Sequence, residues 1–190
     1  VMRRIHKVEP MLKSGDKRYA LEMEVLSHLR QTLEAGTPLR RAQLHEDSLR
    51  MARELFLLTM KPLVYVANVD EASIEAAMLT AAGIAGADRM VPEVAALVQE
   101  AQGDAVVPVC AQLEAQLCEL APEEASEYLQ ELGLNGSALS ELIRAGRRVL
   151  DLITFYTIKG EETRAWTIRR GTTAPEAAGK IHSDMERGFI

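Results

Sequence analysis

Apolar residues recur with a helical period through the first third of the chain. The residues that share a seven-residue spacing are Ile5, Leu12, Tyr19, Leu26 and Leu33. This spacing is typical of a coiled-coil seam, and it predicts a long amphipathic helix interrupted near Gly15. The segment 35–38, AGTP, ends the pattern because glycine caps helices and proline cannot continue one. A second amphipathic helix is predicted from about Asp47, so the two are expected to form an antiparallel helical hairpin.

After the second predicted helix, the helical spacing of apolar residues is replaced by continuous apolar runs. Residues 62–68, PLVYVAN, form a continuous apolar and β-branched run, and residues 105–111, AVVPVCA, form a second one. Such runs are typical of strands that are covered on both faces in a parallel sheet. The Ala-rich stretch 76–100 predicts helix with breaks, so the order is strand, helix, strand. Further helices are predicted at 112–120, 122–132 and 138–150.

The pattern of apolar and polar residues changes again after Asp151. The segments LITFYTI and TRAWTIRR alternate in polarity and are separated by KGEE, which predicts a β-hairpin. Thr173 and Glu176 then have capping-box spacing at the start of a helix. A further strand is expected from Gly188, so this end of the chain is predicted to be a small, incomplete α+β module.

The composition of the chain excludes some classes of protein. The chain has 190 residues, of which 47% are hydrophobic, and its two cysteines predict no disulfide framework. Apolar runs stay well short of the ~20 residues needed to cross a bilayer, so we expect a cytoplasmic protein without a membrane partner. Both ends of the sequence resemble cuts through folded structure, which predicts an internal piece of a longer protein.

The net charge of −6 is unevenly distributed, because residues 140–190 alone are net positive. The arginines gathered there are Arg144, Arg147, Arg148, Arg164, Arg169 and Arg170. They favour a polyanionic partner at this end, or else they form only a solvated helix face and hairpin.

Candidate chemistry lies where the first predicted strand ends, at Asn68-Val69-Asp70-Glu71. Ligands of parallel sheets bind at such carboxyl ends. Guanine-specific proteins carry Asn-Lys-x-Asp there, and the aspartate accepts from the guanine edge. Val69 and Glu71 stand in place of that lysine and aspartate, which weakens a guanine preference and leaves backbone groups near Val69 for an adenine edge. The alternative is a polar turn that merely ends a buried strand.

The second predicted strand ends in Cys110-Ala111, at the position of the base-contacting Ser-Ala-Lys loop of nucleotide switches. The alternative for Cys110 is a small buried thiol. Gly179-Lys180 resembles the end of a phosphate loop but lacks both the leading glycine and the hydroxyl that binds magnesium. These residues therefore contain no phosphate loop and could not transfer a phosphoryl group alone.

Four segments together closely resemble the YchF/Obg-like ATPase family of translation-factor P-loop NTPases. They are KPLVYVANVDE (61–71), VVPVCAQLEAQL (106–117), LIRAGRRVLDLITFYT (142–157) and TRAWTIRRGTTAPEAAGKIHSDMERGFI (163–190). The last of them is similar to the first half of a TGS domain, a β-grasp module. The stretch TFYTIKGEE departs from the more usual TYFTAG pattern, which affects the surface chemistry expected of the hairpin but not its fold.

The resemblance implies an α/β fold: part of a P-loop NTPase parallel sheet with a helical coiled-coil hairpin insertion, followed by a partial β-grasp (TGS) module. Residues 1–55 are expected to be part of the coiled-coil insertion. Residues 56–150 would be the C-terminal half of the nucleotide-binding domain, and 151–190 the N-terminal part of TGS.

The resemblance also implies a function. The family hydrolyses ATP in preference to GTP, and its Asn-x-x-Glu signature is matched by Asn68 and Glu71. Val69 corresponds to the residue whose main chain contacts adenine, and Cys110 and Ala111 would line the pocket. ATP and Mg²⁺ are expected as ligands of the whole protein, with the phosphate loop and metal ligands before Val1, so the 190 residues alone would be inactive.

The expected partners are the ribosome or rRNA, not DNA, and the chain is expected to be a monomer. A rival interpretation is a non-catalytic RNA- or ribosome-binding module. A third is a helical-hairpin scaffold without a ligand, which leaves both buried strands unexplained.

Overall fold

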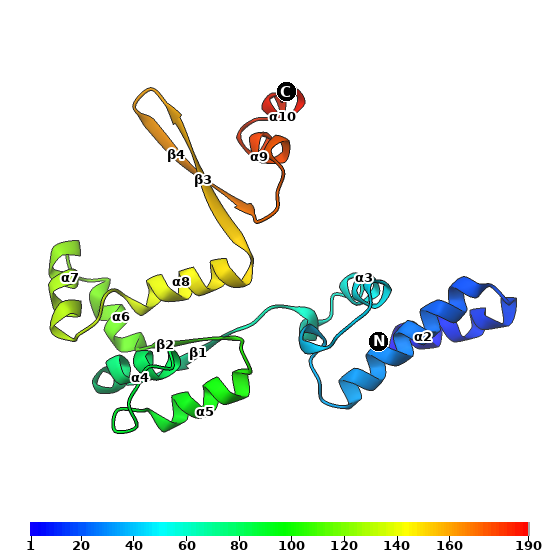
Figure 1. The fold of residues 1–190 in the computed structure, drawn as a ribbon, viewed down its shortest axis with the longest axis horizontal. Helices are drawn as coiled ribbons and strands as arrows, with labels where there is room; N and C mark the ends of the chain where they lie inside the picture. Colours follow the sequence, from blue (N-terminus) through cyan, green and yellow to red (C-terminus); the bar gives the residue numbers. More distant parts are fainter. Residues whose placement is uncertain (190) are drawn as a thin grey trace. The chain divides into compact units, whose positions relative to one another are not determined.

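The computed structural model describes residues 1–189. The chain divides into two compact units, Val1–Pro62 and Leu63–Ile190. Figure 1 follows the first in blue and cyan and the second from cyan-green to red.

The first unit is entirely helical. Its elements are α1 (Met2–Val8), the 3-10 helix η1 (Glu9–Ser14), α2 (Lys17–Glu34), η2 (Leu39–Arg41), α3 (Glu46–Glu54) and η3 (Leu58–Met60). The predicted interruption is confirmed, because Gly15 adopts the left-handed conformation (φ 73°) after η1. Asp16 then caps α2 by accepting from the Arg18 backbone N–H at 2.9 Å.

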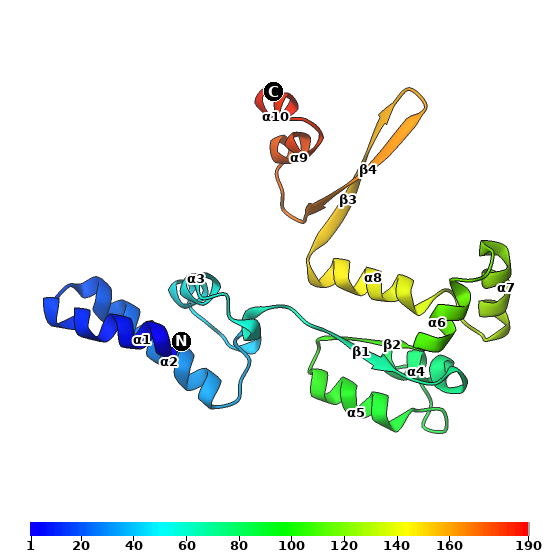
Figure 2. The ribbon, with the colours of Figure 1, turned by 180° about the vertical axis from the view of Figure 1, so that it is seen from behind.

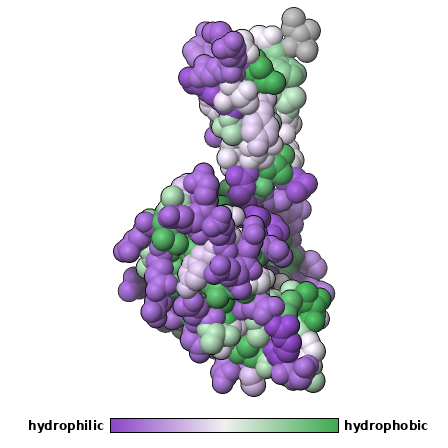
Figure 3. Space-filling view, turned by 90° about the vertical axis from the view of Figure 1, so that its left-hand side faces the viewer, coloured by the Kyte–Doolittle hydropathy of each residue, from purple (hydrophilic) through white to green (hydrophobic). Residues whose placement is uncertain are grey.

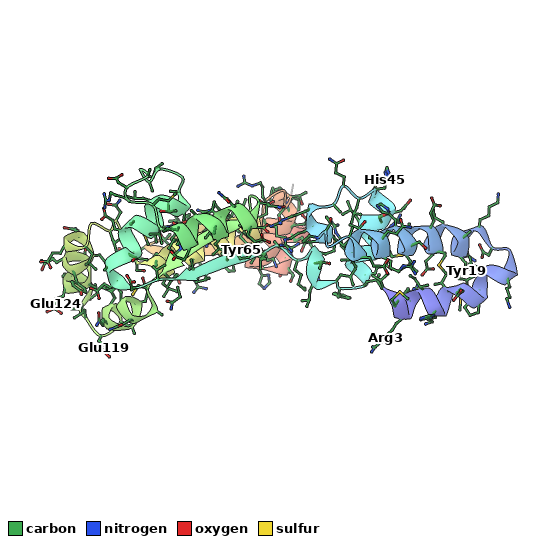
Figure 4. All side chains as sticks on the ribbon, turned by 90° about the horizontal axis from the view of Figure 1, so that it is seen from below. Arg3, Tyr19, His45, Tyr65, Glu119 and Glu124 are labelled. Atoms are coloured by element: carbon green, nitrogen blue, oxygen red, sulfur yellow. The ribbon has the colours of Figure 1, made fainter. Side chains whose placement is uncertain are left out.

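Two apolar clusters hold this unit together. Ile5 and Val8 of α1 pack on the fully buried Leu26 of α2. The second cluster consists of Val25, Leu29, Leu39 and Ala52. Leu12 is 37% exposed because it lies in η1, so the seven-residue seam is not continuous. Figure 4 shows Arg3 projecting outward from α1, on the solvent side of this packing.

The second unit begins with a two-stranded parallel sheet, β1 (Val64–Asn68) beside β2 (Ala105–Val109). The chain between the strands forms η4 (Glu71–Ser73), α4 (Ile74–Ala81) and α5 (Pro92–Ala101). The predicted strand–helix–strand unit is therefore confirmed. The predicted cover of both faces of β1 is not found at Val66 within residues 1–189, where this residue is 50% exposed.

Three helices follow β2: α6 (Ala111–Leu117), α7 (Pro122–Glu131) and α8 (Ala138–Val149). Both α5 and α8 contact β2, and they lie on opposite sides of the strand pair (Figures 1 and 2). The core beside the strand ends consists of Ile74, Cys110, Leu113, Leu117, Leu129 and Leu134. This core joins α4, α6 and α7 around the carboxyl ends of both strands.

The chain then forms an antiparallel hairpin, β3 (Leu152–Lys159) with β4 (Glu162–Arg169), as predicted. Two helices follow, α9 (Ala174–Ile181) and α10 (Ser183–Arg187). The capping box of α9 is confirmed, because Glu176 Oε2 accepts from the Thr173 backbone N–H at 2.9 Å. Gly188 ends α10, so the strand expected from there is not found at 188–189, and Ile190 lies outside the described residues.

Within residues 1–189, every helix is too short or too polar to span a bilayer.

Candidate functional site

The predicted site residues meet at one edge of the parallel sheet. Asn68 and Val109 are register partners, so β1 and β2 end side by side. The side chain of Asn68 crosses to the next segment, where its Oδ1 accepts a hydrogen bond from the Ala111 backbone N–H at 3.2 Å. Asn68 and Ala111 are both exposed. The structure thus brings together the two segments that sequence analysis singled out separately.

Val69 continues the pairing beyond the end of β1. Its backbone N–H donates to the Val109 carbonyl at 2.9 Å, and its side chain packs against the core described above. The amide of Val69 is therefore engaged within the sheet.

Asp70 shapes the turn that follows. Its Oδ1 accepts from the Ser73 backbone N–H at 2.8 Å and so caps η4. Together with the contacts of Asn68 and Val69, this bond fixes the backbone of residues 68–73. These three hydrogen bonds define the conformation of the turn.

Glu71 has a partner that sequence analysis missed. Its Oε1 accepts a 2.7 Å hydrogen bond from the hydroxyl of Tyr128, which lies 57 residues later on α7. The pKa of Tyr128 is raised, first by this hydrogen bond and then by burial, because both disfavour the phenolate. The spacing of apolar residues in α7 gives Tyr128 the pattern of a core residue, and no local motif indicates its hydroxyl partner.

Cys110 lies inward from this edge. Its side chain is 3% exposed, belongs to the core and caps α6, with Sγ accepting from the Leu113 backbone N–H at 3.5 Å. These contacts are those of a small buried thiol. A ligand at the edge would therefore meet the backbone at residues 110–111 rather than the sulfur.

The surface beside the site is acidic. The exposed glutamates of α7 are Glu123, Glu124, Glu127 and Glu131. In Figure 3, which looks at the left-hand side of Figure 1, hydrophilic residues cover most of the face that carries α7. Glu119 and Glu124 project outward at this end (Figure 4).

The predicted arginine cluster is largely paired. Arg144 and Arg148 both bind Glu141, at 3.0 and 2.7 Å. Two further pairs are Arg164 with Glu162 at 2.7 Å and Arg170 with Asp151 at 3.0 Å. Arg147 donates to the Thr154 hydroxyl and links α8 to β3. These contacts place a carboxylate beside four of the six arginines.

Gly179 and Lys180 lie inside α9 rather than in a loop before a helix. This placement agrees with their exclusion as a phosphate loop. Across residues 1–189, no three His, Cys, Asp or Glu side chains are grouped to hold a metal ion.

Comparison with known proteins places these observations in a family. Residues 152–190 match the sequence model YchF-GTPase_C, which is described as a protein of unknown function (DUF933). The protein named "Ribosome-binding ATPase YchF" of Escherichia coli O157:H7 is 43% identical over 188 residues, covering 99% of this chain and 48% of the relative. The protein of the same name from Bacillus subtilis (strain 168) is 40% identical over 193 residues, covering 100% of this chain and 50% of the relative.

The chain belongs to the YchF/Obg-like ATPase family. It spans about half the length of the curated relatives it matches. The solved structure of the Schizosaccharomyces pombe YchF GTPase superposes with a TM-score of 0.77 at 28% identity, over 100% of this chain and 51% of that one. The α/β architecture of this chain is thus the family's architecture over the matched part.

Proposed function

We propose that this chain supplies the base-binding edge of a YchF-type nucleoside-triphosphate hydrolase that prefers ATP and works at the ribosome. The observation that carries the proposal is the Asn68–Ala111 hydrogen bond. It joins the two segments that would hold a base from either side. The bond also sets the orientation of the Asn68 carboxamide, because its oxygen is committed to Ala111 and its NH₂ group is left to donate.

The groups that remain at this edge favour adenine. The Val69 carbonyl is an acceptor and suits the exocyclic amino group of adenine, whereas guanine presents a carbonyl oxygen at the same place. The Asn68 NH₂ group suits an acceptor nitrogen of the adenine ring. Since a site built to pair polar groups rejects a ligand that leaves them unpaired, this pattern supports ATP over GTP.

The domain division of the sequence analysis is part of the proposal. Residues 1–55 would belong to the coiled-coil insertion, 56–150 to the nucleotide-binding domain, and 151–190 to a TGS module. The phosphate loop and the Mg²⁺ ligands would lie in the half of the protein that this chain does not span. When bound there, Mg²⁺ would neutralise charge on the phosphates, while residues 68–71 and 110–111 orient the base.

The names of the relatives support ribosome association but differ on the nucleotide, since the bacterial proteins are called ATPases and the yeast structure a GTPase. Base preference is therefore the property to test. In the full-length protein, Val69→Lys combined with Glu71→Asp restores the guanine-specific pattern. Calorimetry should then show affinity moving from ATP toward GTP, and unchanged affinities for both nucleotides would contradict the proposed base site.

A second candidate function is ribosomal RNA binding that does not depend on nucleotide. The observation in its favour is the hairpin surface, where Arg169 and Tyr156 are both exposed, the latter to 67%. Binding to ribosomal subunits that persists without nucleotide and weakens with salt would support it. Most of the neighbouring arginines already form ion pairs with carboxylates. We therefore expect electrostatic attraction to contribute only modestly to RNA binding.

A further inference from the structure

Glu71 differs from the aspartate of guanine-specific proteins in more than length. In those proteins the carboxylate reads the base, and a free carboxylate here would repel an acceptor nitrogen of adenine. In this chain one carboxylate oxygen already accepts from the Tyr128 hydroxyl at 2.7 Å. Glu71 is half-buried, so it does not simply extend into solvent.

Tyr128 is well placed to hold this carboxylate. Its ring packs against the same core as Val69, the neighbour of Asn68 in the loop. The hydroxyl thus joins α7 to the first residue of η4, while the ring fixes α7 to the core beneath the loop. A tyrosine hydroxyl is protonated at neutral pH, so Tyr128 can donate to Glu71.

We propose that Tyr128 is a positioning residue for nucleotide selection, which holds Glu71 away from the base and so fixes the backbone of residues 68–73 in its adenine-accepting geometry. Glu71 then selects the base indirectly, through the conformation of the turn. The inference rests on the proposed function, because it assigns Tyr128 a role at the same edge of the sheet.

The test uses Tyr128→Phe in the full-length protein, which removes only the hydroxyl. ATP affinity, measured by calorimetry, should fall about threefold to tenfold, as expected for loss of one hydrogen bond. GTP affinity should change less, so the ratio of the two affinities should fall. Tyr156→Phe is the matched control, because it removes a hydroxyl from a side chain that is 67% exposed on the hairpin.

Glu71→Gln and Glu71→Ala complete the design. Glutamine keeps an oxygen that can accept from Tyr128 and should retain most of the ATP preference. Alanine loses the contact that fixes the turn but also the carboxylate that could repel adenine, so its ATP preference should fall less than in Tyr128→Phe. The double variant Tyr128→Phe/Glu71→Ala should bind ATP no more weakly than the weaker-binding single variant, because both changes remove the same hydrogen bond. A purely structural bond would lower the melting temperature without changing the ratio of ATP to GTP affinity.

Hydrogen exchange in the nucleotide-free protein gives an independent measurement. The amide of Val69, bonded to Val109, and that of Ser73, bonded to Asp70, should exchange faster in Tyr128→Phe than in the Tyr156→Phe control. Unchanged exchange and an unchanged affinity ratio in Tyr128→Phe would overturn the role of Tyr128.

Asn68→Ala separates the two possible failures. If Asn68→Ala lowers ATP affinity while Tyr128→Phe does not, the positioning role is wrong and the base site stands. If neither variant changes the affinity for ATP or GTP, the base site itself is wrong.

Discussion

The side-chain oxygen of Asn68 accepts a hydrogen bond from the backbone N–H of Ala111, 43 residues further along the chain. The bond bridges the carboxyl ends of the two parallel strands, β1 and β2. It also ties the first residue of α6 to the last residue of β1. One exposed side chain therefore couples the start of a helix to the turn beside it.

Replacing Asn68 by alanine should separate these two segments. We expect Asn68→Ala to lower the free energy of unfolding by about 0.5–1.5 kcal/mol, the net contribution of one intramolecular hydrogen bond. Urea denaturation of the chain measures this change. Asn68→Asp keeps an oxygen that can accept from Ala111, so its stability should stay close to that of the unmodified chain.

The aspartate variant has a different effect on ligand binding. It loses the NH₂ donors and gains a negative charge, so ATP affinity of the full-length protein should fall even though the fold is retained. An aspartate variant that is as destabilised as the alanine variant would show that the Ala111 contact contributes little. One that binds ATP normally would remove the Asn68 NH₂ group from the base site.

Local sequence patterns predicted the fold well where each element is specified by its own residues. Period and turn chemistry located the parallel strands, the β-hairpin and the capping box of α9, because these features depend on neighbours in sequence. The exposure of Val66 could not be predicted. An apolar strand residue looks the same whether or not another element covers it.

The site was predictable only in part. Asn68 and Ala111 could be singled out because they lie at the ends of the two predicted strands, and parallel strands end at the same edge of a sheet. Tyr128 could not, because its hydroxyl meets Glu71 through the packing of α7 and not through any spacing along the chain. A count of charges likewise did not show that Arg148 and Arg170 form ion pairs with Glu141 and Asp151.

A carboxylate from α6 caps the beginning of α8. Glu114 Oε1 accepts from the Ala138 backbone N–H at 2.6 Å, so a negative charge meets the positive end of the helix dipole. Glu114→Ala should lower the free energy of unfolding by about 1–2 kcal/mol, and Glu114→Gln by less because an acceptor remains. Glu119→Ala is the control, since Glu119 projects outward at the same end of the unit (Figure 4).

Urea denaturation of these three variants measures the order of their stabilities. Equal stability of Glu114→Ala and Glu119→Ala would show that the capping bond makes no net contribution.

Two glycines should respond to alanine with opposite signs. Gly133 ends α7 with φ 72°, and the next residue, Leu134, donates back to the Leu129 carbonyl at 2.9 Å. A side chain is strained in this left-handed conformation, so Gly133→Ala should destabilise the chain by about 1–2 kcal/mol. Gly146 lies inside α8, where an added Cβ meets nothing within 4 Å.

Gly146→Ala should therefore stabilise the chain by up to about 1 kcal/mol, the difference in helix propensity. The midpoints of urea denaturation of the two variants should lie on opposite sides of the native value. A stabilising Gly133→Ala would contradict the left-handed end of α7.

The capping box of α9 should make stability depend on pH. Hydrogen bonds from the Thr173 backbone N–H and hydroxyl hold the pKa of Glu176 below its ordinary value of 4.5. A carboxyl whose folded-state pKa is lowered contributes stability that is complete above its unfolded pKa and is lost as the pH falls through its folded pKa. Glu176→Gln should therefore reduce the loss of stability in denaturation curves recorded from pH 6 downward.

Glu161→Gln, in the hairpin turn, removes one charge without removing a capping bond and should leave the acid dependence as it is. If both variants show the same dependence on pH, the Thr173–Glu176 contact does not contribute to acid sensitivity.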